Sequence, residues 1–398
     1  MQRGDAARID FVQADIASAA SVDAAFSKPW PAAVASLPLT VFHTAAAIRP
    51  WERSAVFWDN SYRVNVAGTA NVVAAAQSAG ANVFVATSSG SVAIPPVSFW
   101  VWPWRAAPID YSVFYDEADF DRPLRPAARF FANYAHSKAQ AERLVCGANT
   151  PAFRTGCIRP ANGVYGDRAD VVVCVSLNLG SVTSWSPHVV QNFVASRNVA
   201  LGHLLFEAAL APDPAAAAAA AAASATPMPG AAGRPFIITD DGPAPAFRDM
   251  YAMMARLTER RPFGEQYPPP LVLLCVSYVV EWWSLVVAYA PVLKSLGVRE
   301  PVWPVLYLQP SVFSVVAHTI ASDAAARKSV RDGGLGYTPG CTSLEGMVDL
   351  VREWNAENRE MDAAAAAAGG TAPISPPVEG KVAKKLVAAG LAPQPVAA

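Results

Sequence analysis

Apolar segments that alternate with a helical pattern constrain the fold of this chain more than any other feature. Residues 39–47, 82–89 and 153–166 read as buried strands, and residues 60–79 carry the apolar spacing of a helix. Apolar strands that alternate with helices are typical of a parallel sheet with helices on both faces. The sequence therefore predicts an α/β fold with a doubly wound parallel sheet.

Ligands of such sheets bind at the carboxyl ends of the strands. A further short strand is predicted at 8–16, and it ends close to Asp15. The residues that fall at the predicted strand ends are Asp15, Ala45, Ala46, Ala47, Ser88, Ser89, Pro160 and Ala161. We expect a binding site to be built from these positions.

The segment NYAHSKAQAE contains Tyr134-x-x-x-Lys138, which follows the TSSGSV segment along the chain. Residues four apart on a helix project from one face, so a lysine there can favour the anion of the tyrosine. A serine hydroxyl at a strand end can bind the same substrate oxygen, which suits proton transfer to or from an alcohol. The alternative is a surface helix with a Lys138–Glu142 ion pair.

With these motifs in this order, the chain resembles an extended short-chain dehydrogenase/reductase, and more narrowly the 3β-hydroxysteroid dehydrogenase family, which includes sterol-4α-carboxylate 3-dehydrogenases. The resemblance covers roughly residues 8–355. Its carriers are QADI (13–16), VFHTAA (41–46), NVAGTANVV (65–73), TSSGSV (87–92), YAHSKAQAE (134–142), IRPANGVYG (158–166), residues 192–210, PFIITDDGP (235–243), residues 326–339 and residues 343–354. It implies a Rossmann-like sheet with a smaller C-terminal substrate region.

The resemblance implies oxidation of a 3β-hydroxyl to a 3-ketone. Tyr134 is then the general base, Lys138 lowers its pKa and holds the nicotinamide ribose, and Ser89 or else Ser88 orients the substrate oxygen. Asn65 is expected to brace the strand-to-helix framework. The substrate is a sterol or steroid, and decarboxylation at C4 or a Δ5 double-bond shift can follow.

The resemblance also implies NAD as cofactor, with NADP not excluded. The residues assigned to the cofactor are Asp15, Ile16, Ala45, Ala46, Tyr134, Lys138, Pro160 and Ala161. The family opens with a Gly-rich turn that receives the pyrophosphate at a helix N-terminus, and this chain begins after that point. An N-terminally truncated dinucleotide domain is the expectation, from an incomplete gene product or from a variant with weak cofactor binding.

Composition bounds the partners. The 398 residues are 53% hydrophobic and 16% charged, with a net charge of −1, which argues against a nucleic-acid partner. Five scattered cysteines without a CxxC motif read as buried free thiols in a reducing compartment, and the histidines show no metal-ligand spacing. His43 is expected to be a core histidine.

The chain divides into a dinucleotide-binding domain at 1–166, a substrate-binding region at 167–361 and a disordered tail at 362–398. An Ala-rich low-complexity insertion at 212–234 interrupts the second part.

The segment 271–293 is long enough to span a bilayer. Glu281 lies at its middle, where a carboxylate costs about 2.5–3.5 kcal/mol, so docking on a membrane surface is favoured over spanning or over a buried helix. The resemblance places such a protein at the cytoplasmic face of the endoplasmic reticulum membrane.

Two other functions stay open from the sequence. The first is an extended reductase or epimerase that acts on a sugar nucleotide or a small ketone. The second is a catalytically impaired, membrane-associated binding protein, because the Gly-rich turn is missing.

Overall fold

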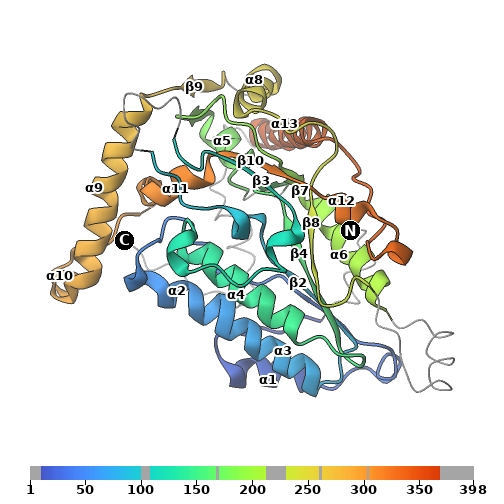
Figure 1. Cartoon of the computed structure of the whole chain (residues 1–398). Coiled ribbons are helices and arrows are strands. Elements are labelled where there is room, and N and C mark those ends of the chain that lie inside the picture. Colours follow the sequence, from blue (N-terminus) through green and yellow to red (C-terminus); the bar gives the residue numbers. More distant parts are fainter. Residues whose placement is uncertain are drawn as a thin grey trace.

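The main sheet of the protein has four parallel strands. The structure is a computed structural model, and it describes residues 10–99, 108–166, 170–211, 230–259, 262–302 and 304–367. The strand order is β1-β2-β4-β8, with β1 Thr40–His43, β2 Val83–Thr87, β4 Arg154–Pro160 and β8 Pro235–Ile238 (Figure 1). The register places Val85 beside Phe42 on one side and beside Gly156 on the other. The predicted α/β parallel sheet is confirmed.

Strand β2 shows why helices cover both faces of this sheet. Phe84 and Ala86 pack into one core with residues of α1, α3 and α4, whereas Val83 and Val85 pack into another core with residues of α6. Alternate side chains of a strand point to opposite faces, so a strand that is buried on both sides needs a continuous apolar run. Figure 1 shows α1, α3 and α4 together on one side of the sheet.

The helices complete the element order. They are α1 Ala19–Phe26, α2 Trp58–Tyr62, α3 Thr69–Ser78, α4 Asn133–Gly147, α5 Cys174–Leu179, α6 Ser196–Leu210, α8 Phe247–Leu257, α9 Pro270–Tyr289, α10 Pro291–Ser295, α11 Pro310–Val315, α12 Ala324–Arg327 and α13 Ser343–Ala367. Short 3₁₀ turns lie at Ala55–Phe57, Gly90–Ala93, Glu117–Asp119, Ala127–Arg129, Val305–Tyr307 and Val330–Asp332.

Three two-stranded parallel pairs complete the strands. They are β3 Ser112–Tyr115 with β10 His318–Ala321, β5 Val164–Tyr165 with β7 Val194–Ala195, and β6 Ser181–Thr183 with β9 Gly264–Gln266. A separate core lies among α5, α8 and α13, where Met250, Met347 and Trp354 are buried. Helices α5 and α8 and most of α13 belong to the predicted substrate-binding region at 167–361.

The predicted helix at 60–79 forms, but its middle is a π-helical segment, Arg63–Gly68. The helix ends at Gly80, whose φ of 74° is left-handed. The Ala81 amide donates to the Ala76 carbonyl and the Gly80 amide to the Gln77 carbonyl, which is the Schellman arrangement of a helix end.

The strand predicted at 8–16 is wrong for its described part. Residues 10–15 are irregular, and the Asp15 carboxylate accepts a hydrogen bond from the Ala17 amide in the turn that leads into α1. Within the described ranges this segment pairs with no strand, and β2 is the one strand partner of β1. The apolar pattern was too short to distinguish a strand from an extended lead into a helix.

Three other sequence expectations need correction. The helix expected at 271–293 is broken into α9 and α10, because Pro291 cannot donate an amide hydrogen to continue α9. The tail expected from 362 still belongs to α13 up to Ala367, and residues 368–398 lie outside the described residues, as do 212–229 of the insertion. All five cysteines are free thiols as expected, but Cys275 is exposed.

Candidate active site

The candidate site forms where β2 ends and α4 begins. Ser88 and Ser89 directly follow β2, and Tyr134 lies in the first turn of α4. Asn133 fixes this turn, because its amide donates to the Glu52 carbonyl at 2.8 Å and its side chain donates to the Ser54 carbonyl at 2.8 Å. The start of the helix is therefore held by the loop that follows β1.

Tyr134 is partly buried and lies near Ser89. It packs against a cluster that includes Phe131 and Ala135, and Val315 of α11 lies against the same cluster. Burial raises the pKa of the Tyr134 phenol, and the nearby Ser89 hydroxyl lowers it in part. The phenol is therefore a partly buried acid next to a hydroxyl group at the end of β2.

The two serines point to different surroundings. The Ser89 hydroxyl contacts the Ser91 hydroxyl at 2.8 Å and accepts from the Ser91 amide. The Ser88 hydroxyl is buried without a hydrogen-bond partner among the described residues. Ser89 and Tyr134 are brought together, whereas Ser88 points into the protein beside Lys138, Thr69 and Cys157.

Lys138 is buried one turn after Tyr134, and its ammonium donates to the Thr87 carbonyl at 2.5 Å. Burial lowers the pKa of Lys138 to about 8. The expected lowering of the Tyr134 pKa by Lys138 is not what the structure shows. The ammonium is directed to the end of β2, and burial dominates at the phenol.

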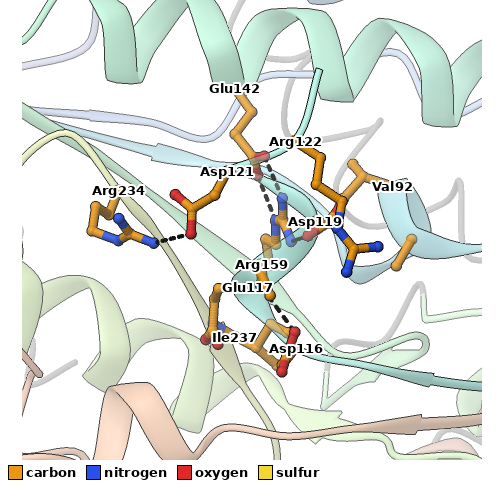
Figure 2. Close-up of polar contacts among 12 residues, drawn as sticks. Val92, Asp116, Glu117, Asp119, Asp121, Arg122, Glu142, Arg159, Arg234 and Ile237 are labelled. Carbon is orange, nitrogen blue, oxygen red and sulfur yellow. Dashed lines mark hydrogen bonds and ion pairs between the residues drawn. The ribbon is translucent and has the colours of Figure 1, made fainter. Parts of the chain in front are cut away.

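Glu142, one turn beyond Lys138, belongs to a different pair. Its carboxylate accepts two hydrogen bonds from Arg159 of β4, at 2.8 and 2.6 Å, and Arg159 also pairs with Asp119 at 2.5 Å (Figure 2). Arg159 and Glu142 are both buried. The surface helix with a Lys138–Glu142 pair is therefore wrong, and no sequence pattern indicated Arg159 as the partner of Glu142.

Asn65 braces the framework as expected. Its side chain bonds both backbone groups of Ala47, at 2.8 and 3.0 Å, and donates to the Ser137 hydroxyl at 2.9 Å. It lies in the π-helical segment, a feature that often marks functional sites. One side chain thus connects the loop after β1 to α4.

His43, at the end of β1, is buried and contacts the Thr69 hydroxyl at 3.0 Å. Burial, together with the charge of Lys138, lowers the pKa of His43 to about 4. This imidazole is a neutral part of the core, as the sequence predicts.

The structure distributes the predicted cofactor residues in two groups. Ala45 and Ala46 follow β1 at the surface, and Asp15 is exposed with its carboxylate bonded to the Ala17 amide. Ile16 packs beside Gly68, while Pro160 and Ala161 are buried. Asp15, Ala45 and Ala46 are accessible to a ligand, whereas Pro160 and Ala161 are buried at the end of β4.

Comparisons with known proteins now bear on this geometry. A family model described as the 3-beta hydroxysteroid dehydrogenase/isomerase family matches residues 4–99 and 117–262, which is more than half of the chain. The chain belongs to this family.

The family's curated members include the human sterol-4-alpha-carboxylate 3-dehydrogenase, decarboxylating, which is 28% identical over 235 residues, or 56% of this chain and 52% of that protein. This chain spans about half the length of the curated relatives it matches.

Solved structures show the same fold. An epimerase from Methanothermobacter thermautotrophicus has a TM-score of 0.54 and 18% identity, covering 88% of this chain and 80% of that one. RMD from Pseudomonas aeruginosa complexed with NADPH has a TM-score of 0.50 and 16% identity, covering 87% and 88%. The predicted Rossmann-like parallel sheet is therefore confirmed.

In this 3β-hydroxysteroid dehydrogenase family member, sequence reasoning missed Gly90. A Cβ atom at Gly90 would lie 2.5 Å from the Tyr115 hydroxyl and 2.8 Å from the Pro160 carbonyl. The turn after Ser89 therefore passes too close to β4 for any side chain. The glycine within TSSGSV was the available signal.

Proposed function

We propose that this family member oxidises the 3β-hydroxyl of a sterol or steroid to a 3-ketone with a nicotinamide dinucleotide. The observation that carries the proposal is that Ser89 at the end of β2 lies near enough to the Tyr134 phenol to lower its pKa, one helical turn from the buried Lys138. The family of the chain supports this class of reaction.

In the proposed mechanism, Ser89 holds the substrate oxygen and Tyr134 accepts its proton. Burial raises the pKa of Tyr134, so its anion needs both the Ser89 hydroxyl and a nearby cation. Lys138, one helical turn along α4, is proposed to supply this charge. Its ammonium donates to the Thr87 carbonyl at the end of β2.

Asp15, Ile16, Ala45 and Ala46 are proposed to hold the dinucleotide, together with Tyr134 and Lys138. The fit rests on the exposed, small residues after β1 and on the Asp15 carboxylate, which has no cationic partner among the described residues. NAD or NADP, when bound, supplies the acceptor for the hydride. A 3-ketone next to a C4 carboxylate favours loss of carbon dioxide, and the similarity to the human decarboxylating dehydrogenase supports that course over a Δ5 double-bond shift.

Helix α9 is proposed to dock on a membrane, at the cytoplasmic face of the endoplasmic reticulum. Of the described helices, α9 alone is long and apolar enough to cross a bilayer, but its inner face is packed on the protein. Glu281 on that face accepts hydrogen bonds from Arg53 at 2.6 and 2.7 Å. Val279 and Trp282 on the outer face are each 63% exposed, which suits shallow docking.

The test is an assay of the purified protein with NAD⁺ or NADP⁺ and a 3β-hydroxysterol, with the 3α-epimer as control. We expect dinucleotide reduction with the 3β-alcohol and little with the epimer. Absence of reaction with several 3β-hydroxysterols, while a sugar nucleotide or small alcohol is oxidised, would contradict the proposal.

A further inference from the structure

A cavity of about 410 Å³ lies between α4, β3 and the loop that carries Arg122 and Arg125. Figure 2 shows its polar side, with Arg159 between Glu142 and Asp119 and with Arg122 nearby. Its volume lies within the range of small-molecule sites. The proposed mechanism uses none of the side chains that line it.

The charges of the cavity wall do not cancel. Arg159 forms a closed network with Glu142 and Asp119, in which two carboxylates face one guanidinium. Three more guanidinium groups line the cavity, those of Arg122, Arg125 and Arg143. In the part of the chain that the structure describes, none of these three pairs with a carboxylate.

Two of these guanidinium groups, those of Arg125 and Arg143, are held by neutral groups. Arg125 donates to the Val92 carbonyl and lies 4.5 Å from the centroid of the Phe130 ring. Arg143 donates to the Arg122 carbonyl at 2.5 Å. Burial lowers the pKa of Arg125, and the charge of Asp119 offsets only part of this effect.

Asp116 is the one remaining carboxylate on the wall, and it accepts a hydrogen bond from the Ala118 amide. Four arginines and three carboxylates therefore line the cavity, which leaves one net positive charge on its wall. This excess of positive charge attracts an anion.

Apolar side chains make up the rest of the cavity. Val92, Leu124 and Phe130 line it, and Phe114, which is 77% exposed, lies at its rim. Val92 and Phe130 also belong to the apolar cluster against which Tyr134 packs, so this cluster separates the cavity from the catalytic hydroxyl.

We propose that this cavity binds a small amphipathic anion, with a carboxylate or phosphate at the arginines and a short apolar chain over Leu124 and Phe130. Guanidinium groups present paired donors that match the oxygens of both anions. The apolar lining adds affinity in proportion to the ligand surface that it removes from water.

The test is calorimetric titration of the protein with octanoate, octyl phosphate and the neutral octanol. We expect saturable binding of at least one anion. Octanol should bind at least about tenfold more weakly than that anion, because it cannot form the charged hydrogen bonds. The preferred anion identifies the headgroup. Equal binding of octanol, or no saturable anion binding, would overturn the proposal.

The matched variants are Arg122→Gln with Arg143→Gln, and Arg331→Gln with Arg352→Gln as a control at exposed positions outside the cavity. Arg125 is left intact because it holds the turn after Ser89. The cavity variant should weaken anion binding about tenfold or more, and the control should not. Equal affinity in both variants would place the anion elsewhere and contradict the assignment.

Discussion

Helices α4 and α9 differ in which side chains they bury: α4 buries polar side chains, and α9 leaves apolar ones exposed. Helix α4 buries Asn133, Ser137, Lys138 and Glu142, and each of these side chains has a hydrogen-bond partner. Helix α9 instead leaves large apolar side chains exposed, on a face that points away from the protein body. These side chains are Leu271, Val272, Val276, Val279, Trp282 and Trp283.

The difference shows that composition alone does not place a helix. A buried polar side chain is tolerated where a partner is built for it, as Arg159 is for Glu142. An exposed apolar face of this extent marks a surface for a partner other than water. The inner face of α9 also carries a paired polar side chain, because Glu281 forms an ion pair with Arg53. Figure 1 shows α9 at the periphery of the molecule.

Removing the partner of Arg159 should give the largest effect. Glu142→Ala leaves a buried guanidinium with Asp119 as its remaining partner, and we expect a loss of about 3–5 kcal/mol in the free energy of unfolding. Urea unfolding measures this loss. The control is Glu259→Ala, which breaks the exposed pair with Arg359 and should cost about 1 kcal/mol or less. Similar losses in the free energy of unfolding for both variants would show that the buried pair of α4 contributes no more stability than an exposed pair.

Acid should destabilise the protein through His43. Its folded pKa of about 4 lies below the ordinary histidine value of 6.5, so the unfolded chain binds more protons between these pH values. Stability from this group is complete above pH 6.5 and falls by up to about 3 kcal/mol as the pH drops to 4. His43→Gln should flatten that part of the curve, and His188→Gln, at an exposed position, should leave it unchanged. An unchanged slope for His43→Gln would show that the site stays hydrated.

The apolar face of α9 gives the smallest effect in this series. Val279→Glu with Trp282→Glu places two carboxylates on the exposed face, and we expect vesicle binding to fall about tenfold or more. Co-sedimentation with phospholipid vesicles measures it. Val330→Glu, at an exposed valine outside α9, is the control and should bind as the parent does. A parent protein that does not sediment with vesicles would remove the proposed docking.

The sheet could be predicted from the sequence because its strand Val83–Thr87 is buried on both sides and is therefore a mostly apolar run. The segment at 8–16 failed because a short apolar run does not specify a strand partner. The positions of Tyr134, Lys138 and Ser89 followed from helix spacing and from strand ends. Nothing in the sequence distinguished Ser89 from Ser88, because that choice depends on how the backbone turns at Gly90.

The partners of the buried polar groups were also beyond the sequence. Glu142 and Arg159 lie on different elements, and the Arg159 guanidinium reaches Glu142 only because β4 packs under α4. The same holds for Asn65 and Ala47, which are joined by the π-helical segment. Such pairs depend on the packing of elements, which local patterns do not contain.

The central claim is that the Tyr134 hydroxyl is the proton acceptor at the end of β2. Tyr134→Phe keeps the ring in its apolar cluster and removes the hydroxyl that lies near Ser89. We expect turnover of a 3β-hydroxysterol to fall by about 10²-fold or more, with sterol binding nearly unchanged. Steady-state rates, with sterol affinity measured in parallel, test this directly. Turnover of the Tyr134→Phe protein close to that of the parent would contradict the account.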